Sequence, residues 1–378
     1  MKVLVAIDSF KGSLTSLQAG NAVKNAILRA DKNARVLVKP LADGGEGTTE
    51  ALAFGFNSQT VKLTVNDPLL RPIEAEYVIL RDTNTAVIEM AAAAGITLIS
   101  DKERNPLNTT TYGVGEIIKD AVKRGCNKFI VGIGGSATND GGTGMLAALG
   151  FEFLDKDKKP IAYGAIGLKD LCSIKTDHVI PELEKCNFTI ACDVANPLCG
   201  ENGCSAVFAP QKGGTPDMIV EMDEWLNKYA EAVKNVFPKA NPDMKGAGAA
   251  GGLGFAFMSF TNATLKPGID IVISETGIEN EIKNADIIVT GEGKLDAQSI
   301  MGKAPVGIAK LAKKYGKKVI AFAGCVSADA EICNEYGIDA FFPILREVTS
   351  LDKALNTDFA SRNLEAAAYQ AFRLICNV

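Results

Sequence analysis

Histidine is almost absent from this sequence, and its scarcity excludes two kinds of chemistry. His178 is the single histidine among 378 residues. A metal site built from several histidines, or a mechanism that needs a pair of them, is therefore excluded. His178 itself lies in the polar stretch SIKTDHVIPELEK, away from any glycine-rich loop, so we expect a solvated surface side chain.

The nine cysteines lack the spacing of a metal or disulfide framework. No C-x-x-C pair occurs and the number is odd, so neither a zinc ribbon nor a set of structural disulfides is predicted. Reduced thiols in a cytosolic protein are the simpler interpretation.

Long apolar runs and clustered positive charge are also missing. No stretch of about 18 uncharged apolar residues occurs, so no membrane span is expected. The N-terminal apolar run is interrupted by Asp8 and is too short for a secretion signal. With a net charge of −5 and no basic patch, nucleic acid is not an expected partner. We expect a cytoplasmic protein.

Glycine, in contrast, is abundant, and the chain is long. There are 37 glycines, against roughly 26 at an ordinary usage of about 7%. A chain of 378 residues exceeds a usual single core, so two domains are expected.

Apolar runs alternate with helix-like runs at both ends of the chain. Continuous Val and Ile runs are typical of parallel strands that are covered on both faces. The pattern predicts a doubly wound parallel sheet, with strands at 3–7, 36–38, 286–289, 318–323 and 341–345 and helices between them, one of them at about 46–53.

The middle of the chain has a different pattern. Between residues 60 and 89, short alternating runs are separated by turn residues, which is typical of antiparallel sheet. We predict an α/β protein in which a Rossmann-like domain, residues 1–61 plus 281–378, is interrupted by an inserted α/β domain with a mixed sheet, residues 62–280.

Glycine and charged residues stand together after three of these predicted strands and after the apolar run 129–131, which we also read as a strand. The segments are DSFKGS from Asp8, ADGGEG from Ala42, GIGGSATNDGGTG from Gly132 and TGEGKLD from Thr290. In an open parallel sheet, ligands bind beyond the carboxyl ends of the strands. Four such loops are therefore more than ordinary turns.

The glycines have a predicted use in phosphate binding. They let backbone N–H groups approach a phosphate at a helix N-terminus, without a Cβ in the way. Asp43 and Asp140, each in a D-G-G-x-G segment, would repel a phosphate unless Mg²⁺ lies between them or they face a substrate hydroxyl. Simple N-capping is the alternative, more so for Asp140, because Glu46 adds a second carboxylate near Asp43.

Two other nucleotide-binding motifs fit this sequence only in part or not at all. Gly132-x-Gly134-x-x-Ala137 fits the dinucleotide fingerprint, and Glu152 lies twenty residues after Gly132, but the expected helix starts late. Gly302-Lys303 is not a Walker A motif, because Ala304 follows and the earlier glycine is missing. A phosphoryl-transfer enzyme with this sequence would lie outside the P-loop class.

Six motifs together resemble the bacterial class I glycerate kinases. They are DSFKGSLT, ADGGEGT, GIGGSATNDGGTG, DVANPLCG, GAAGGLGF and GEGKLDAQS, in order along essentially the whole chain. The resemblance implies phosphorylation of D-glycerate with ATP and Mg²⁺ in the cytoplasm. It also implies two α/β domains, one of them Rossmann-like and discontinuous, with the active site in the cleft between them.

For phosphoryl transfer, the protein mainly positions groups and neutralises charge. We expect Lys11 or Arg71 to hold the carboxylate of glycerate, and Asp43 and Glu46 to hold Mg²⁺. The predicted base is Asp193, which ends the apolar run 188–192, with Asp8 and Asp296 as alternates. The other expected contacts are Ser136 and Asn139 for the substrate, and Lys294, Gly134, Gly135, Ser136, Gly291 and Gly293 for ATP.

Some choices stay open at this point. The product is 2-phosphoglycerate or 3-phosphoglycerate, with the former favoured because the family more often makes it. An NAD-binding oxidoreductase and a non-catalytic sugar-acid binding module are the rival functions.

Overall fold

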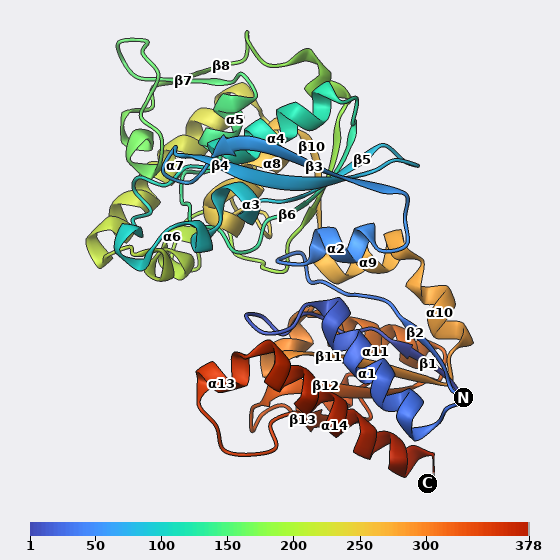
Figure 1. Cartoon of the computed structure of the whole chain (residues 1–378). Helices are drawn as coiled ribbons and strands as arrows, with labels where there is room; N and C mark the ends of the chain where they lie inside the picture. Colours follow the sequence, from blue (N-terminus) through green and yellow to red (C-terminus); the bar gives the residue numbers. More distant parts are fainter. Residues whose placement is uncertain (377–378) are drawn as a thin grey trace. The chain divides into compact units, whose positions relative to one another are not determined.

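A computed structural model describes residues 1–376, which form two compact units (Figure 1). The first contains Met1–Asp43, Glu50–Phe54 and the chain from Pro267 onward. The second contains Gly44–Thr49 and Gly55–Lys266. The limits 62 and 280 for the inserted domain stay a prediction.

The first unit is built on a sheet of five parallel strands. The order is β13-β12-β11-β1-β2, so β1, from the start of the chain, lies between β2 and β11, which comes late in the chain. Their bounds are β1 Lys2–Val5, β2 Arg35–Val38, β11 Ile287–Leu295, β12 Lys318–Val326 and β13 Ala340–Pro343.

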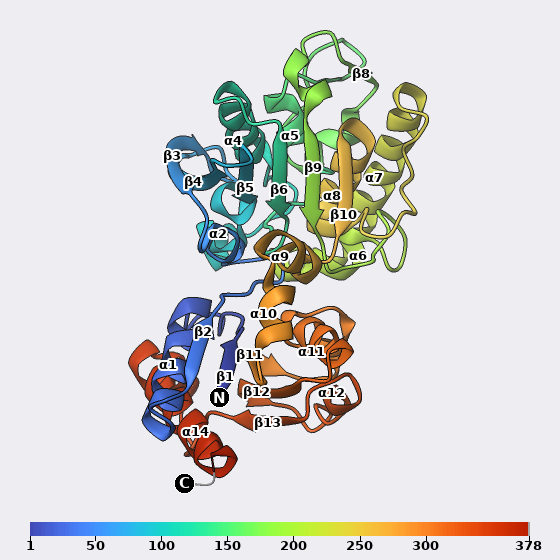
Figure 2. The same ribbon diagram turned by 90° about the vertical axis from the view of Figure 1, so that its right-hand side faces the viewer.

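Helices cover both faces of this sheet, as Figure 2 shows. α1 (Ser16–Ala30) and α14 (Thr357–Ile375) share one apolar core with the strands, and α11 (Ala304–Lys314) lies on the other face. Thr15 forms a capping box with Gln18 at the start of α1. The remaining helices are α9 Gly268–Thr276, α10 Ile278–Asn284, α12 Ile332–Glu335, α13 Leu351–Leu355 and the 3₁₀ turn Ala297–Met301.

The second unit has a six-stranded mixed sheet in the order β10-β9-β6-β5-β4-β3. β3, β4 and β5 pair antiparallel, and β5, β6, β9 and β10 pair parallel. The bounds are β3 Ser58–Asn66, β4 Pro72–Leu80, β5 Thr85–Glu89, β6 Lys128–Gly132, β9 Asn187–Ala191 and β10 Asn262–Lys266, with a separate hairpin of β7 Glu152–Leu154 and β8 Ser173–Lys175. The predicted fold class is confirmed.

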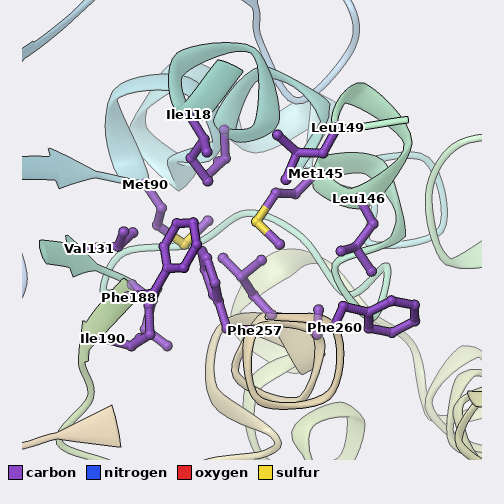
Figure 3. Packing of buried hydrophobic residues seen from close by; sticks show 14 of the residues in the cluster. Met90, Ile118, Val131, Met145, Leu146, Leu149, Phe188, Ile190, Phe257 and Phe260 are labelled. Carbon is purple, nitrogen blue, oxygen red and sulfur yellow. The ribbon is translucent and has the colours of Figure 1, made fainter. Parts of the chain in front are cut away.

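One large apolar core holds the second unit together. Figure 3 shows side chains of α4, α5, β6, β9 and α8 meeting around Met145 and Phe257. The helices are α3 Ala91–Ala94, α4 Tyr112–Lys123, α5 Thr143–Ala148, α6 Cys204–Phe208, α7 Pro216–Val236 and α8 Ala249–Phe260; the 3₁₀ turns are Ile96–Leu98, Asp101–Glu103, Ala165–Asp170, Pro181–Lys185 and Pro210–Lys212. α2 (Thr48–Ala53) has residues in both units.

Two local expectations need correction. The predicted strand 286–289 continues as β11 to Leu295, because its backbone stays paired with β12 as far as Leu295 and Val326. The motif GEGKL is therefore part of a strand rather than a loop after it. The helix predicted from Glu46 begins instead at Thr48.

No helix within residues 1–376 is long and apolar enough to cross a membrane.

Candidate functional site

The carboxyl ends of the first unit's strands surround a cavity of about 360 Å³. The loop after β1 lines it together with the last residues of β11 and β12 and the segment after β13. Its lining residues are Asp8, Ser9, Phe10, Lys11, Ser13, Asp43, Glu292, Gly293, Lys294, Lys303, Gly324, Cys325, Ile344, Leu345, Leu351, Ala354, Leu355 and Ala360. Four sequence-predicted side chains, Asp8, Lys11, Asp43 and Lys294, are among them.

Backbone geometry fixes the loop after β1. The Ser16 hydroxyl donates to the Ile7 carbonyl at 2.5 Å and accepts from the Leu41 N–H at 2.9 Å, which ties α1 to the segments before Asp8 and Asp43. Phe10 and Leu14 exchange two backbone hydrogen bonds around a tight turn. Gly12 has φ of 75° in that turn, a conformation that favours glycine.

Asp8 is the most deeply buried carboxylate of this cavity. Asp8 is 3% exposed, and its Oδ1 accepts a hydrogen bond from the Ser9 N–H at 2.7 Å. Burial raises the pKa of Asp8 well above its ordinary value, and the nearby charge of Asp43 raises it further. Lys11 opposes both effects but does not cancel them.

Lys11 and Asp43 form an ion pair across the same cavity. Lys11 Nζ lies 3.3 Å from Asp43 Oδ2. Burial lowers the pKa of Lys11, but the charges of Asp43 and Asp8 outweigh that effect, so the net direction is upward. The ammonium group therefore stays charged at neutral pH and faces two carboxylates.

A second group of charges lies along the end of β11 and the start of α11. Lys303 Nζ lies 3.3 Å from Glu292 Oε2 and 3.6 Å from Asp296 Oδ1, and Lys294 Nζ lies 3.2 Å from Asp296 Oδ2. The Ser299 hydroxyl donates to Glu292 Oε1 at 2.6 Å. Three lysines, Lys11, Lys294 and Lys303, thus line one cavity.

The two acidic groups of this cluster differ in their titration. Burial raises the pKa of Glu292, although Ser299 and Lys303 act against it. Burial alone would raise the pKa of Asp296, but the hydrogen bond from Lys294 and the charge of Lys303 lower it overall. Asp296 is therefore held as an ion-paired carboxylate, which makes it a poor proton acceptor.

Sequence reasoning missed Glu292 and Lys303. Both belong to the motifs named above, in which Glu292 is expected in a loop and Lys303 only fails the Walker pattern. The missing signal was the period of two along β11, because Glu292 and Lys294 lie two residues apart on one strand. Gly293 between them lines the cavity, whereas Gly291 packs so tightly that a Cβ would meet the Phe322 carbonyl at 2.1 Å.

Several glycines of the loop 132–144 in the second unit are required for close packing. A Cβ at Gly132 would meet the Gly44 carbonyl at 2.4 Å, and one at Gly142 would meet Ala256 at 2.4 Å. At Gly144 it would meet the Thr110 hydroxyl at 2.0 Å. These glycines serve close packing within the unit. A Cβ added at Gly135 would have its nearest neighbour 3.6 Å away, so there is free space beside this glycine.

Asp140 caps this loop from within. It is fully buried, and its carboxylate accepts from the Thr111 N–H at 2.8 Å, the Thr111 hydroxyl at 2.9 Å, the Gly142 N–H at 3.1 Å and the Gly144 N–H at 3.3 Å. Burial raises the pKa of Asp140, and these donors oppose the rise. The capping alternative accounts for Asp140.

A buried lysine under the same loop was also missed. Lys212 Nζ donates to the Ser136 hydroxyl at 2.7 Å and to the Thr138 carbonyl at 2.6 Å. Burial lowers the pKa of Lys212 to about 8. Because the Ser136 oxygen accepts this bond, the hydroxyl hydrogen of Ser136 must point away from Lys212.

The remaining predicted residues lie in the second unit. Asn139 is fully buried, and its amide donates to the Ser205 hydroxyl at 2.9 Å, so it has no open face for a substrate. Two carboxylates hold the Arg71 guanidinium, Asp67 at 2.6 Å and Glu103 at 2.7 Å. Asp193 is exposed after β9, and Glu46 is exposed before α2.

The donor set of the first unit's cavity fits a hard divalent cation. Within residues 1–376 no group of three or more His, Cys, Asp or Glu side chains is arranged to enclose a metal ion. Magnesium is usually held by one or two carboxylates, with substrate phosphates and water completing the shell. Asp8 and Asp43 supply two neighbouring carboxylates, and the repulsion that raises the pKa of Asp8 would be relieved by a cation.

Comparison with known proteins gives one consistent result. The model of the glycerate kinase family matches residues 3–376. The chain is 43% identical to a glycerate kinase of Haemophilus influenzae over 99% of both chains, and 42% identical to the glycerate 2-kinase of Escherichia coli K12 over 97% of both. It is also similar to the crystal structure of a protein provisionally named glycerate kinase 2 from Salmonella typhimurium LT2, with 41% identity, a TM-score of 0.89 and coverage of 100% of this chain and 98% of that one. With the match extending over nearly its full length, the chain belongs to the glycerate kinase family.

Proposed function

We propose that the protein transfers the γ-phosphoryl group of ATP to O2 of D-glycerate in a Mg²⁺-dependent reaction in the cytoplasm. The observation that carries this proposal is the cavity at the carboxyl edge of the parallel sheet, where three lysines and two neighbouring carboxylates line one space in a member of the glycerate kinase family. A triphosphate and a sugar acid are both anionic, so both need such cations. The 42% identical relative named glycerate 2-kinase supports O2 as the acceptor.

The lysines divide between two kinds of anion in this proposal. Lys294 and Lys303 neutralise the phosphates, because both project from the β11–α11 corner into the cavity. Lys11, at the tip of the loop after β1, holds the carboxylate of glycerate. Arg71 is not part of the proposed site, because Asp67 and Glu103 already occupy its guanidinium.

Asp8 replaces Asp193 as our first choice of base. A buried carboxylate with a raised pKa accepts a proton more readily than an exposed or ion-paired one. The hydroxyl oxygen of glycerate forms a bond to the γ-phosphorus, the bond from that phosphorus to the bridging β–γ oxygen breaks, and ADP leaves with the bonding electrons. The hydroxyl proton passes to Asp8.

Asp43 is the group that would hold Mg²⁺, which supplies positive charge for the transferring phosphoryl group. Glu46 stays a prediction as a further metal-binding group, because it is exposed and lies in the second unit. In the second unit we retain Gly134, Gly135 and the Ser136 hydroxyl as donors to substrate or phosphate oxygens. Lys212 supports this assignment because it leaves the Ser136 hydroxyl free to donate.

Phosphorus NMR of the product tests the function. With D-glycerate, ATP and Mg²⁺, we expect ADP and 2-phosphoglycerate in equal amounts. A 3-phosphoglycerate signal would reassign the acceptor oxygen. ATP consumption that does not depend on glycerate at any pH from 6 to 9 would contradict the kinase. NADH binding with altered nicotinamide fluorescence, or glycerate binding without turnover, would favour the two rivals.

The metal assignment has its own test. Asp43→Asn keeps the size of the side chain and removes its charge, so we expect activity to require at least tenfold more Mg²⁺. Glu46→Gln is the matched variant and separates the contributions of the two predicted ligands. An unchanged Mg²⁺ dependence of Asp43→Asn would show that this carboxylate serves only to pair with Lys11.

A further inference from the structure

Part of the first unit's cavity lining is apolar, and phosphates and carboxylates do not explain it; we call this part the apolar end. Phe10 from the loop after β1, Ile344 and Leu345 after β13, and Leu351 and Leu355 of α13 line this end. Leu351 is 71% exposed and Leu355 is 37% exposed, so two leucines of one short helix keep much of their apolar surface in contact with solvent. Such surface is stabilised when an apolar group covers it.

Two serine hydroxyls in the same lining lack hydrogen-bond partners. Ser9 Oγ and Ser13 Oγ are both buried and unpaired within the described part of the chain. Ser13 belongs to the apolar end, because its carbonyl accepts from the Thr357 hydroxyl at 2.9 Å, just after α13. An unpaired buried hydroxyl costs free energy that a bound ligand recovers. These two serines therefore indicate, independently of the leucines, that this space takes a ligand with polar atoms as well as an apolar face.

We propose that the apolar end is the subsite for the nucleobase of the phosphoryl donor, and that it accepts purine and pyrimidine nucleoside triphosphates alike. The inference rests on the proposed function, because it takes the lysine-rich end of the same cavity as the place of the phosphates. A nucleoside triphosphate has the matching composition: a flat ring at one end, a hydroxylated sugar in the middle and anionic groups at the other end. Concave sites with apolar walls and few polar groups are typical of such ligands.

The lack of base discrimination follows from the side chains in the lining. Within the described residues 1–376, the lining holds no Asn, Gln, Arg, Tyr or His side chain. These side chains would distinguish an amino group from a carbonyl group on a base edge. The Ser13 hydroxyl can rotate to donate or to accept, so it pairs with either group. Apolar contact with Leu351 and Leu355 depends on the ring surface and not on its pattern of polar atoms.

The first experiment measures donor specificity with the whole protein. kcat/KM is determined for ATP, GTP, CTP and UTP at saturating D-glycerate and Mg²⁺, with tripolyphosphate as a donor that lacks base and sugar. We expect the four nucleotides to agree within about tenfold and tripolyphosphate to be at least 100-fold poorer. A preference for ATP of 1,000-fold or more over GTP would overturn the permissive subsite.

The second experiment places the base on α13. Leu351→Ser and Leu355→Ser should each raise KM for ATP by about fivefold or more, with kcat and KM for glycerate within twofold of the wild type. Val348→Ser is the matched control, because Val348 is fully exposed on the same segment and does not line the cavity. Its KM for ATP should stay unchanged.

Calorimetric titration with ATP in the absence of glycerate distinguishes a failure of the proposed subsite from a failure of the proposed function. If the wild type binds ATP and makes phosphoglycerate, but the two leucine variants bind ATP as tightly as the wild type, the subsite is wrong and the kinase assignment stands. If the wild type makes no phosphoglycerate from any of the four nucleotides, the proposed function fails first.

Discussion

Asp8 in the first unit and Asp140 in the second are buried aspartates with raised pKa values, yet their surroundings differ. Asp140 accepts hydrogen bonds from two backbone N–H groups of its own loop and from the N–H and hydroxyl of Thr111, whereas Asp8 accepts a hydrogen bond from the Ser9 N–H. The glycines follow the same division. Those around Asp140 are packed against neighbours, and Gly293 near Asp8 lines a cavity. The comparison teaches that two buried aspartates near glycines can have different surroundings, one enclosed by hydrogen bonds and close packing and the other beside a cavity.

The sharpest test of this difference is the same substitution at both aspartates. Asp8→Asn should lower kcat by about 100-fold or more, because a general base contributes some 10²–10⁴-fold. Its melting temperature at pH 7 should be equal to or above that of the wild type. A raised carboxyl pKa means that the folded state binds the proton more tightly, so this group loses stability as pH rises from its ordinary pKa through the raised one.

The companion substitutions complete that test. Asp140→Asn should destabilise the protein by about 1–3 kcal/mol, because the amide cannot accept from all of its donors. Asp193→Asn should retain most of the activity. A crippled Asp193→Asn beside a healthy Asp8→Asn, both measured by kcat, would restore the base predicted from the sequence.

Adding one methyl group tests the two classes of glycine. Gly142→Ala should destabilise the protein by about 3 kcal/mol, because Gly142 has φ of 77° and its new Cβ would meet Ala256. Gly293→Ala should change stability by less than about 0.5 kcal/mol, since the atom nearest to the added Cβ would lie 3.5 Å from it. Thermal and denaturant unfolding measure both. Equal losses would show that loop 132–144 is no more tightly packed than the cavity wall.

The buried lysine of the second unit predicts a pH dependence of stability. The pKa of Lys212 in the folded state is about 8, below its ordinary 10.5, so between these values the unfolded chain binds more protons than the folded one. Stability from this group therefore rises with pH between about 8 and 10. Relative to Lys212→Met, the wild type should gain on the order of 2 kcal/mol over that range. A difference independent of pH would mean that Lys212 keeps an ordinary pKa.

Lys294, an exposed lysine of the first unit, should affect activity and hardly affect stability. Lys294→Ala should lower kcat/KM by more than tenfold, because it removes a positive charge that we propose neutralises the phosphates. Its melting temperature should barely change, because 59% of the Lys294 side chain is exposed and such ion pairs contribute little stability. Early melting together with normal activity of the folded variant would identify Lys294 as a structural partner of Asp296.

The smallest effect is expected at the single histidine. The His178 side chain is 73% exposed, and Nδ1 lies 3.2 Å from Glu152 Oε1, at the antiparallel hairpin of the second unit. His178→Ala should retain at least about a third of the wild-type kcat, since a catalytic general base would contribute far more. A loss of 100-fold would contradict a mechanism based on carboxylates.

The sequence by itself determined the fold class and many of the site's residue types. Continuous Val and Ile runs at both ends of the chain specify parallel strands, because such strands are buried on both faces. The scarcity of histidine left carboxylates and lysines as the chemical groups, and the rule that ligands bind at the carboxyl ends of strands correctly pointed to Asp8, Lys11 and Asp43 as neighbours.

Only the tertiary structure decided which glycines and charges line a cavity. Gly142 and Gly293 look alike in sequence, and they differ because Ala256, more than 100 residues away, fills the space beside one of them. The burial of Lys212 could not be predicted from the sequence, because a lysine is ordinarily a surface residue. Only the packing of α6 and the loop around Lys212 makes it buried. Likewise, Lys303 joins Glu292 because β11 and the start of α11 meet at one corner. Local sequence encodes backbone preference and apolar pattern, whereas the space and charge around a side chain come from segments that are distant along the chain.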